Sequence, residues 1–94
     1  MTQSTRTTIA TPHASRYLQQ LCKHWSHKAK ADFTPAAGTV TFETWQVAMQ
    51  ATDGALDVTV TVQNADEMAR MQDVVTSHLQ RFATQETLSA AWAA

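Results

Sequence analysis

Residues 47–62 read VAMQATDGALDVTVTV, and this stretch decides the fold. Apolar and polar side chains alternate on both sides of Asp53-Gly54. Such a pair between alternating segments is a strong signal for a two-residue turn that joins antiparallel strands. A turn at this point places apolar residues opposite one another: Ala51 and Leu56, Met49 and Val58, Val47 and Val60.

The same register extends toward the N-terminus. A turn at Thr44-Trp45 places Phe42 opposite Val47 and Val40 opposite Met49, and a loop over residues 35–38 places Phe33 opposite Val40. All the apolar side chains then share one face, which a slip of one residue would destroy. The other face is polar: Thr39, Thr41, Glu43, Gln46, Ala48, Gln50, Asp57, Thr59 and Thr61. We expect this face to be solvated or to pair with a second subunit.

An amphipathic helix is predicted on each side of the strands. Thr11-Pro12 is a typical helix start, and the apolar residues that follow recur at helical spacing: Ala14, Tyr17, Leu18, Leu21, Cys22, Trp25 and Ala29. Asn64, with Glu67 three residues later, caps a second helix. Its apolar stripe contains Met68, Met71, Val75, His78, Leu79 and Phe82.

These elements predict a single α+β domain over residues 11–94, preceded by a flexible lead-in over residues 1–10. The predicted fold is a two-layer sandwich of order α-β-β-β-β-α, with a four-stranded antiparallel meander and both helices on one face. The segment after Ala83 alternates apolar and polar residues, so a short C-terminal strand, a docked extended segment and a helical end all fit.

The composition excludes several classes of protein. Seven basic and eight acidic residues give a net charge of −1, which is the wrong balance for a nucleic-acid-binding protein. No apolar run approaches the ~20 residues of a membrane span. The first ten residues lack the apolar core of a secretory signal. The lone Cys22 fits a reducing compartment, so we expect a cytoplasmic protein.

Histidines are the main candidates for chemistry. His24 and His27 are three residues apart on the first helix, so the pair fits half of a metal site, although two histidines alone are an incomplete site and the spacing favours exposed histidines at a basic helix end. Antiparallel helices would leave an axial gap of about 10 Å between His24 and His78. This gap disfavours a triad of His24, His27 and His78, and we expect a buried His78 to bond the hydroxyl of Tyr17 or a threonine.

Signals for catalysis are weak. Cys22 faces an apolar stripe, which would raise its pKa and suppress nucleophilicity. Gly38 and Gly54 are interpreted as turn residues, so no glycine-rich phosphate loop is present. Asp66 and Glu67 are accounted for by the helix cap. The sequence therefore favours a protein that is not an enzyme.

The two helix motifs resemble those of a bacterial family catalogued as domain of unknown function 2218. The first motif runs from His13 through Arg16-Tyr17-Leu18 to His27-Lys28, and the second includes His78-Leu79, Arg81-Phe82-Ala83, Glu86 and Trp92. The resemblance covers residues 11–92, but a glycine expected near Thr44-Trp45 is missing. Related domains can accompany siderophore-reductase genes, which implies iron handling and a partner protein of iron metabolism.

We therefore expect a small binding domain that takes an iron-, haem- or metal-related ligand through its histidine-bearing helices. The candidate ligand-binding residues are His24, His27, Lys28, His13, His78 and Arg81, with His24 and His27 as metal ligands. The lysines at the helix end would favour an anionic ligand. The alternative is a protein-interaction module, or a homodimer formed through the polar sheet face or the helices, with no ligand.

Overall fold

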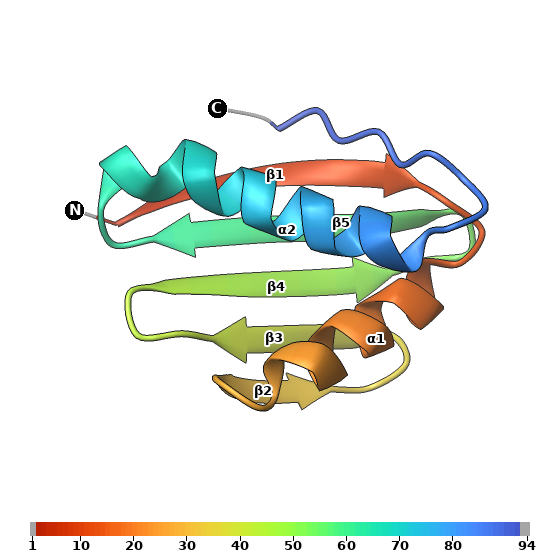
Figure 1. The fold of residues 1–94 in the computed structure, drawn as a ribbon, viewed down its shortest axis with the longest axis horizontal. Coiled ribbons are helices and arrows are strands. Elements are labelled where there is room, and N and C mark those ends of the chain that lie inside the picture. The colour runs from red at the N-terminus through yellow and green to blue at the C-terminus, as the bar shows by residue number, and fades with distance from the viewer. Residues whose placement is uncertain (1, 93–94) are drawn as a thin grey trace.

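The chain folds into two layers, a five-stranded antiparallel sheet and two helices that cover one of its faces (Figure 1). This computed structural model describes residues 2–92. The strands, in the spatial order β1-β5-β4-β3-β2, are β1 (Gln3–Ala10), β5 (Ala55–Val62), β4 (Trp45–Ala51), β3 (Ala37–Thr41) and β2 (Lys30–Phe33). The helices are α1 (Ala14–Trp25), the 3₁₀ turn η1 (Ala65–Glu67) and α2 (Met68–Phe82). The α+β class and the placement of both helices are confirmed.

The predicted strand count of four is wrong because residues 3–10 form β1 rather than a flexible lead-in. β1 pairs with β5 along its whole length, from Gln3 opposite Val62 to Ala10 opposite Ala55. Its buried side chains are Thr5, Thr7 and Ile9. Threonine is β-branched and fits a strand well, but two threonines in the inward positions hide the apolar alternation that would have revealed it.

The predicted register is confirmed for the pair β4–β5, whereas the pairs β3–β4 and β2–β3 are each shifted by two residues. β4 and β5 pair as expected, with Val47 opposite Val60. In β3, however, Val40 pairs with Val47, and Gly38 pairs with Phe33. A shift of two residues keeps every side chain on its expected face, because the side-chain period of a strand is two.

The shift arises at the turns. Phe42 N–H donates to the Trp45 carbonyl at 2.8 Å, which places Glu43 and Thr44 at the tip of the β3–β4 hairpin. The Phe42 and Trp45 rings stack at 4.3 Å and 5°, and the ring of Trp25 meets both edge-on. This aromatic contact is made only when the hairpin closes one residue earlier than predicted.

Gly38 is a strand residue beneath α1 and not the turn residue that was predicted. A Cβ atom at this position would lie 2.8 Å from Cys22 Sγ, 2.9 Å from Phe33 Cβ and 3.1 Å from Leu18 Cδ2. Glycine therefore allows α1 to approach β3 closely. Gly54, in contrast, has no atom within 4 Å of such a Cβ.

The second helical region begins at the expected cap, Asn64, whereas the N-cap of α1 is His13, which makes no side-chain cap hydrogen bond, and not the predicted Thr11. Thr11 Oγ1 accepts from His13 N–H at 3.1 Å, and α1 follows from Ala14, two residues later than predicted. Asn64 Oδ1 accepts from Asp66 N–H at 3.0 Å and begins η1, which leads into α2. Neither helix of the described chain is long and apolar enough to cross a membrane.

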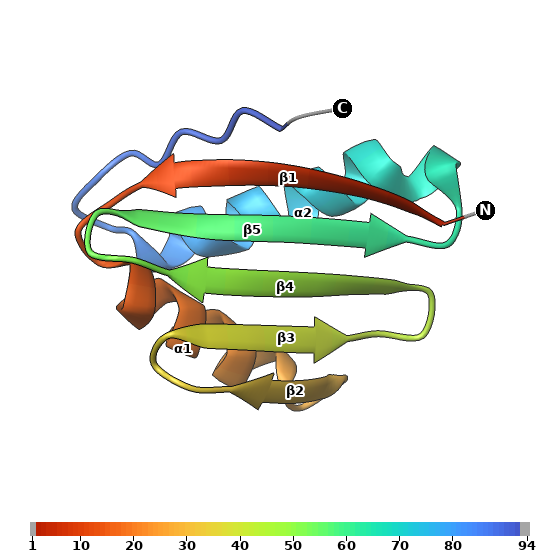
Figure 2. The ribbon, with the colours of Figure 1, turned by 180° about the vertical axis from the view of Figure 1, so that it is seen from behind.

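The segment after α2 is extended and docked, which is one of the three conformations expected for it. It runs back beside β1 (Figure 1). The Gln80 side chain bonds the carbonyls of Ala83 and Glu86 and the N–H of Leu88, and Ala91 N–H donates to Thr7 Oγ1 at 3.0 Å. No helix covers the other face of the sheet over residues 2–92, as Figure 2 shows from behind.

Candidate functional site

The structure brings His24 of α1 and His78 of α2 together, with ring centres 5.5 Å apart. We call these two side chains the histidine pair. The predicted separation of about 10 Å is wrong because it assumed antiparallel axes, whereas α1 runs obliquely to the strands and α2 lies nearly along them (Figure 1). His24 is exposed and His78 is half-buried.

The hydrogen bond of His78 determines which of its ring nitrogens carries the proton. Its Nδ1 lies 2.7 Å from the carbonyl of Val74, and not from the hydroxyl of Tyr17 or a threonine, as was predicted. A carbonyl oxygen only accepts, so Nδ1 carries the proton in the neutral ring. The lone pair of His78 therefore resides on Nε2.

An aromatic cluster adjoins the histidine pair. The Trp25 ring lies 5.2 Å from that of His78, and the Phe82 ring lies 6.2 Å from that of His24. Trp25 also contacts Phe42 and Trp45 of the β3–β4 hairpin, and both rings are only partly buried. A ligand at the histidine pair would therefore meet imidazole nitrogens beside aromatic rings.

Several basic residues lie around the end of α1. Lys23, Lys28 and Lys30 are exposed there, while the acidic Glu43 lies at the tip of the β3–β4 hairpin, whose Phe42 and Trp45 rings meet Trp25. Cations at a helix C-terminus also face the negative end of the helix dipole, which keeps them near the last turn. This end of the molecule suits an anionic ligand.

The remaining candidate residues lie apart from the histidine pair or project into solvent. His27, Lys28 and Arg81 are exposed, and His27 lies in the turn that follows α1. His13 is exposed at the other end of α1, with its ring 6.1 Å from that of Tyr17. Within residues 2–92 no three His, Cys, Asp or Glu side chains gather closely enough to hold a metal ion. Metal binding by His24 and His27 remains a prediction.

A second polar site, which the sequence did not predict, lies at the start of α1. The hydroxyls of Tyr17 and Thr11 both donate to Glu86 Oε2, at 2.5 Å and 2.9 Å. Burial raises the pKa of Tyr17 above its ordinary value, with a further contribution from Glu86. The hydrogen bond from Tyr17 lowers the pKa of Glu86. A buried tyrosine needs a partner for its hydroxyl, which was the available signal, but nothing in the sequence identified that partner as Glu86.

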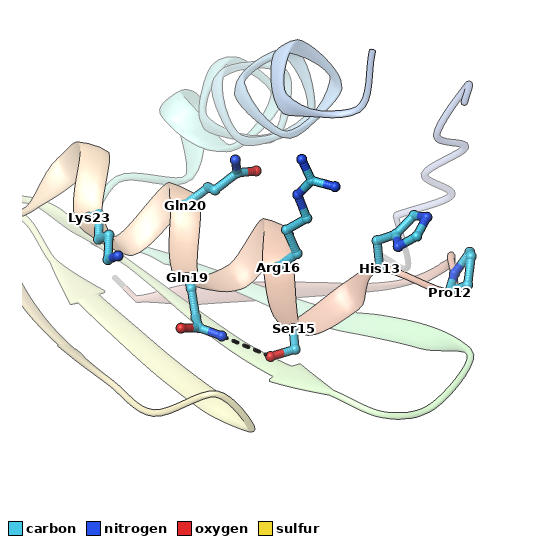
Figure 3. Close-up of a pocket in the computed structure, with 7 residues that line it drawn as sticks. All are labelled: Pro12, His13, Ser15, Arg16, Gln19, Gln20 and Lys23. Carbon is cyan, nitrogen blue, oxygen red and sulfur yellow. Dashed lines mark hydrogen bonds between the residues drawn. The ribbon is translucent and has the colours of Figure 1, made fainter. Parts of the chain in front are cut away.

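Two shallow depressions flank this network. One, of about 520 Å³, lies between α1 and the docked segment and is lined by His13, Arg16, Tyr17, Phe82 and Glu86 among others. The other runs along the exposed side of α1, where Gln19 Nε2 donates to Ser15 Oγ and Arg16 extends outward (Figure 3). The hydroxyl of Tyr17 and the carboxylate of Glu86 are engaged with each other, so the first depression resembles a structural contact more than a reaction centre.

Cys22 offers no nucleophile. Its side chain is fully buried beneath α1, and burial raises the pKa of its thiol to about 11. A thiol with such a pKa is protonated at neutral pH and unreactive. The expectation of an inert, buried cysteine is confirmed.

Comparison with known proteins gives a family but no activity. The chain is similar to PA4090 from Pseudomonas aeruginosa, whose structure was determined by NMR, with 34% identity and a TM-score of 0.80. The match covers 96% of this chain and 94% of that one. No curated protein matches. The model of a family described as uncharacterised proteins conserved in bacteria matches residues 6–93. The chain therefore belongs to this bacterial family, domain of unknown function 2218.

Proposed function

We propose that the protein is a non-enzymatic binding domain that takes an anionic, iron-, haem- or metal-related ligand at the histidine-bearing ends of its helices. One observation carries the proposal: imidazoles from two different helices, His24 and His78, lie 5.5 Å apart. Neutral imidazole nitrogens are good donors to iron and to other transition metals. A pair held by separate helices is positioned by the fold and not by local sequence alone.

Charge and aromatic surface support the same ligand class. Lys23 and Lys28 would attract carboxylate groups, such as those of a metal chelate or of haem. The partly buried rings of Phe82, Phe42 and Trp45 would contact the apolar part of such a ligand. The lone buried Cys22 agrees with a cytoplasmic location, in which a partner protein of iron metabolism would deliver or receive the ligand.

The alternative is an interaction module or a homodimer, and the uncovered sheet face favours it (Figure 2). Its polar side chains already bond one another across the strands, with Ser4 Oγ 2.9 Å from Thr61 Oγ1 and Thr8 Oγ1 2.6 Å from Asp57 Oδ1. Because these side chains already bond one another, they have fewer free hydrogen-bonding groups to offer a partner, which weakens this alternative. A concentration-dependent mass in sedimentation equilibrium would support the homodimer.

Calorimetric titration with ferric citrate and with haemin tests the proposed function. We expect binding by the wild type and weaker binding by Lys23→Gln/Lys28→Gln and by His24→Ala/His27→Ala. His13→Ala is the matched control, since His13 lies eleven residues before His24, about 16 Å along the helix axis. If neither compound binds the wild type, or if all variants bind equally, the proposed function is wrong.

A further inference from the structure

We infer that His24 and His78 supply two adjacent imidazole ligands to one non-haem transition-metal ion, either free or held in a carboxylate chelate. The inference rests on the proposed function and deepens it, because it names the coordinating residues and selects a non-haem metal over haem. It also replaces the pair His24 and His27 that the sequence suggested.

The separation of the rings carries the argument. A metal–nitrogen bond of about 2.0–2.1 Å, with the ring centre about 1.1 Å behind the nitrogen, puts two imidazole centres about 5 Å apart around a tetrahedral ion. The centres of His24 and His78 are 5.5 Å apart, with an angle of 47° between the ring planes. A small rotation of the exposed His24 side chain closes the difference.

The same geometry disfavours a haem that is bound by both histidines. The porphyrin nitrogens surround the iron in one plane, so two histidines can bind only on opposite sides. By the same bond lengths their ring centres would then lie about 6.4 Å apart, with the ion directly between them. His24 and His78 are closer than that, and Trp25 packs against His78 on the same side of the sheet. The pair therefore fits two neighbouring coordination positions.

The hydrogen bond from His78 Nδ1 to the Val74 carbonyl is the second observation. Histidines that bind metals through one nitrogen commonly donate the other N–H to a carbonyl or carboxylate, which fixes the orientation of the ring and raises its basicity. The bond of 2.7 Å is already made within α2, one turn before the ring. His78 is therefore oriented as a ligand through Nε2.

The remaining coordination positions would be filled from outside residues 2–92, within which no third His, Cys, Asp or Glu joins the pair. Carboxylate oxygens of a chelate would suit them, because exposed lysines such as Lys28 and Lys30 follow the end of α1 and would attract anionic groups. A site with two protein ligands and anionic donors from its ligand matches a domain that receives a metal complex and releases it again.

Zinc is the probe for the test. Long-range ¹H–¹⁵N imidazole spectra should show the Nδ1–H form of His78 before addition and Zn²⁺-dependent shifts of Nε2 in both His24 and His78. Zn²⁺ affinity should fall at least ~10-fold in His24→Ala and in His78→Gln. Loss of a residue that only hydrogen-bonds a metal ligand already lowers metal affinity by about that factor, so loss of a ligand itself should cost no less. His27→Ala and His13→Ala are matched controls and should keep wild-type affinity.

The outcomes separate this inference from the proposed function. Unchanged Zn²⁺ affinity in His24→Ala, or its loss in His27→Ala, overturns the inference; His24 is exposed, so that variant should fold even if His78→Gln does not. A low-spin, six-coordinate haemin spectrum that disappears in both His24→Ala and His78→Gln overturns it too, yet leaves the proposed function standing. Zinc bound by the pair without binding of ferric citrate or haemin supports the inference for a free metal ion and removes the anionic iron and haem ligands from the proposed function.

Discussion

Gly38→Ala is expected to destabilise the protein through a clash beneath α1. The added Cβ would lie 2.8 Å from Cys22 Sγ and 2.9 Å from Phe33 Cβ. Phe33 is the partner of Gly38 across the β2–β3 ladder, so its Cβ moves only if the strand moves. Relief of the clash therefore requires the backbone to shift, and overpacking of this kind costs about 1–3 kcal/mol.

Gly54→Ala is the matched control for this prediction. No atom lies within 4 Å of a Cβ at Gly54, and no glycine within residues 2–92 has a positive φ. Replacement of glycine also lowers the entropy of the unfolded chain, by about 0.4–1 kcal/mol where the backbone is compatible. The difference between the two variants removes this shared gain and isolates the clash at Gly38.

Urea denaturation followed by tryptophan fluorescence measures the difference. For a chain of this size the slope is near 1 kcal/mol per M urea, so the midpoint of Gly38→Ala should lie about 1–3 M below that of Gly54→Ala. In a Cys22→Ala background the effect of Gly38→Ala should shrink by about 0.5 kcal/mol or more, since the nearest clashing atom is gone. Equal midpoints for the two glycine variants would refute the packing of α1 on β3 and the shifted register of that strand.

Three further changes test the core and the network at Glu86. Val60 is fully buried in the central part of the sheet, so Val60→Asp should abolish folding; a well-dispersed proton NMR spectrum would mean that the faces of β5 are inverted. Thr76 Oγ1 is buried without a hydrogen-bond partner, so Thr76→Val should raise the free energy of unfolding by about 1 kcal/mol. A decrease in the free energy of unfolding would contradict this prediction. Tyr17→Phe should lower stability most near neutral pH, as followed by urea midpoints across pH. The contribution of Glu86, whose pKa is lowered from 4.5, is lost as pH falls through that lower value, and the contribution of Tyr17, whose pKa is raised from 10.0, is lost as pH rises through the raised value. A pH-independent difference between Tyr17→Phe and wild type would rule out this coupling.

The sequence predicted the local elements because their signals are local. Asp53-Gly54 and the alternation around it specify the β4–β5 hairpin, and Asn64 specifies the start of the second helical region. The side-chain period of two also made the inward face of the sheet predictable, even where the register was shifted. The motifs of the two helices were enough to identify the family.

Tertiary structure alone decided the rest, because those features depend on contacts between distant segments. β1 is a strand because β5 presents a free edge with which it pairs. Two of its buried side chains are threonines, whose polar character hides these inward positions from a sequence-based prediction. Gly38 belongs to β3 because Cys22 and Leu18 leave no room there for a side chain. The meeting of His24 with His78 depends on the angle at which α1 and α2 lie side by side on the sheet (Figure 1), which spacing along either helix does not encode. A helix period fixes which residues share a face, but only packing on the common sheet fixes which faces meet.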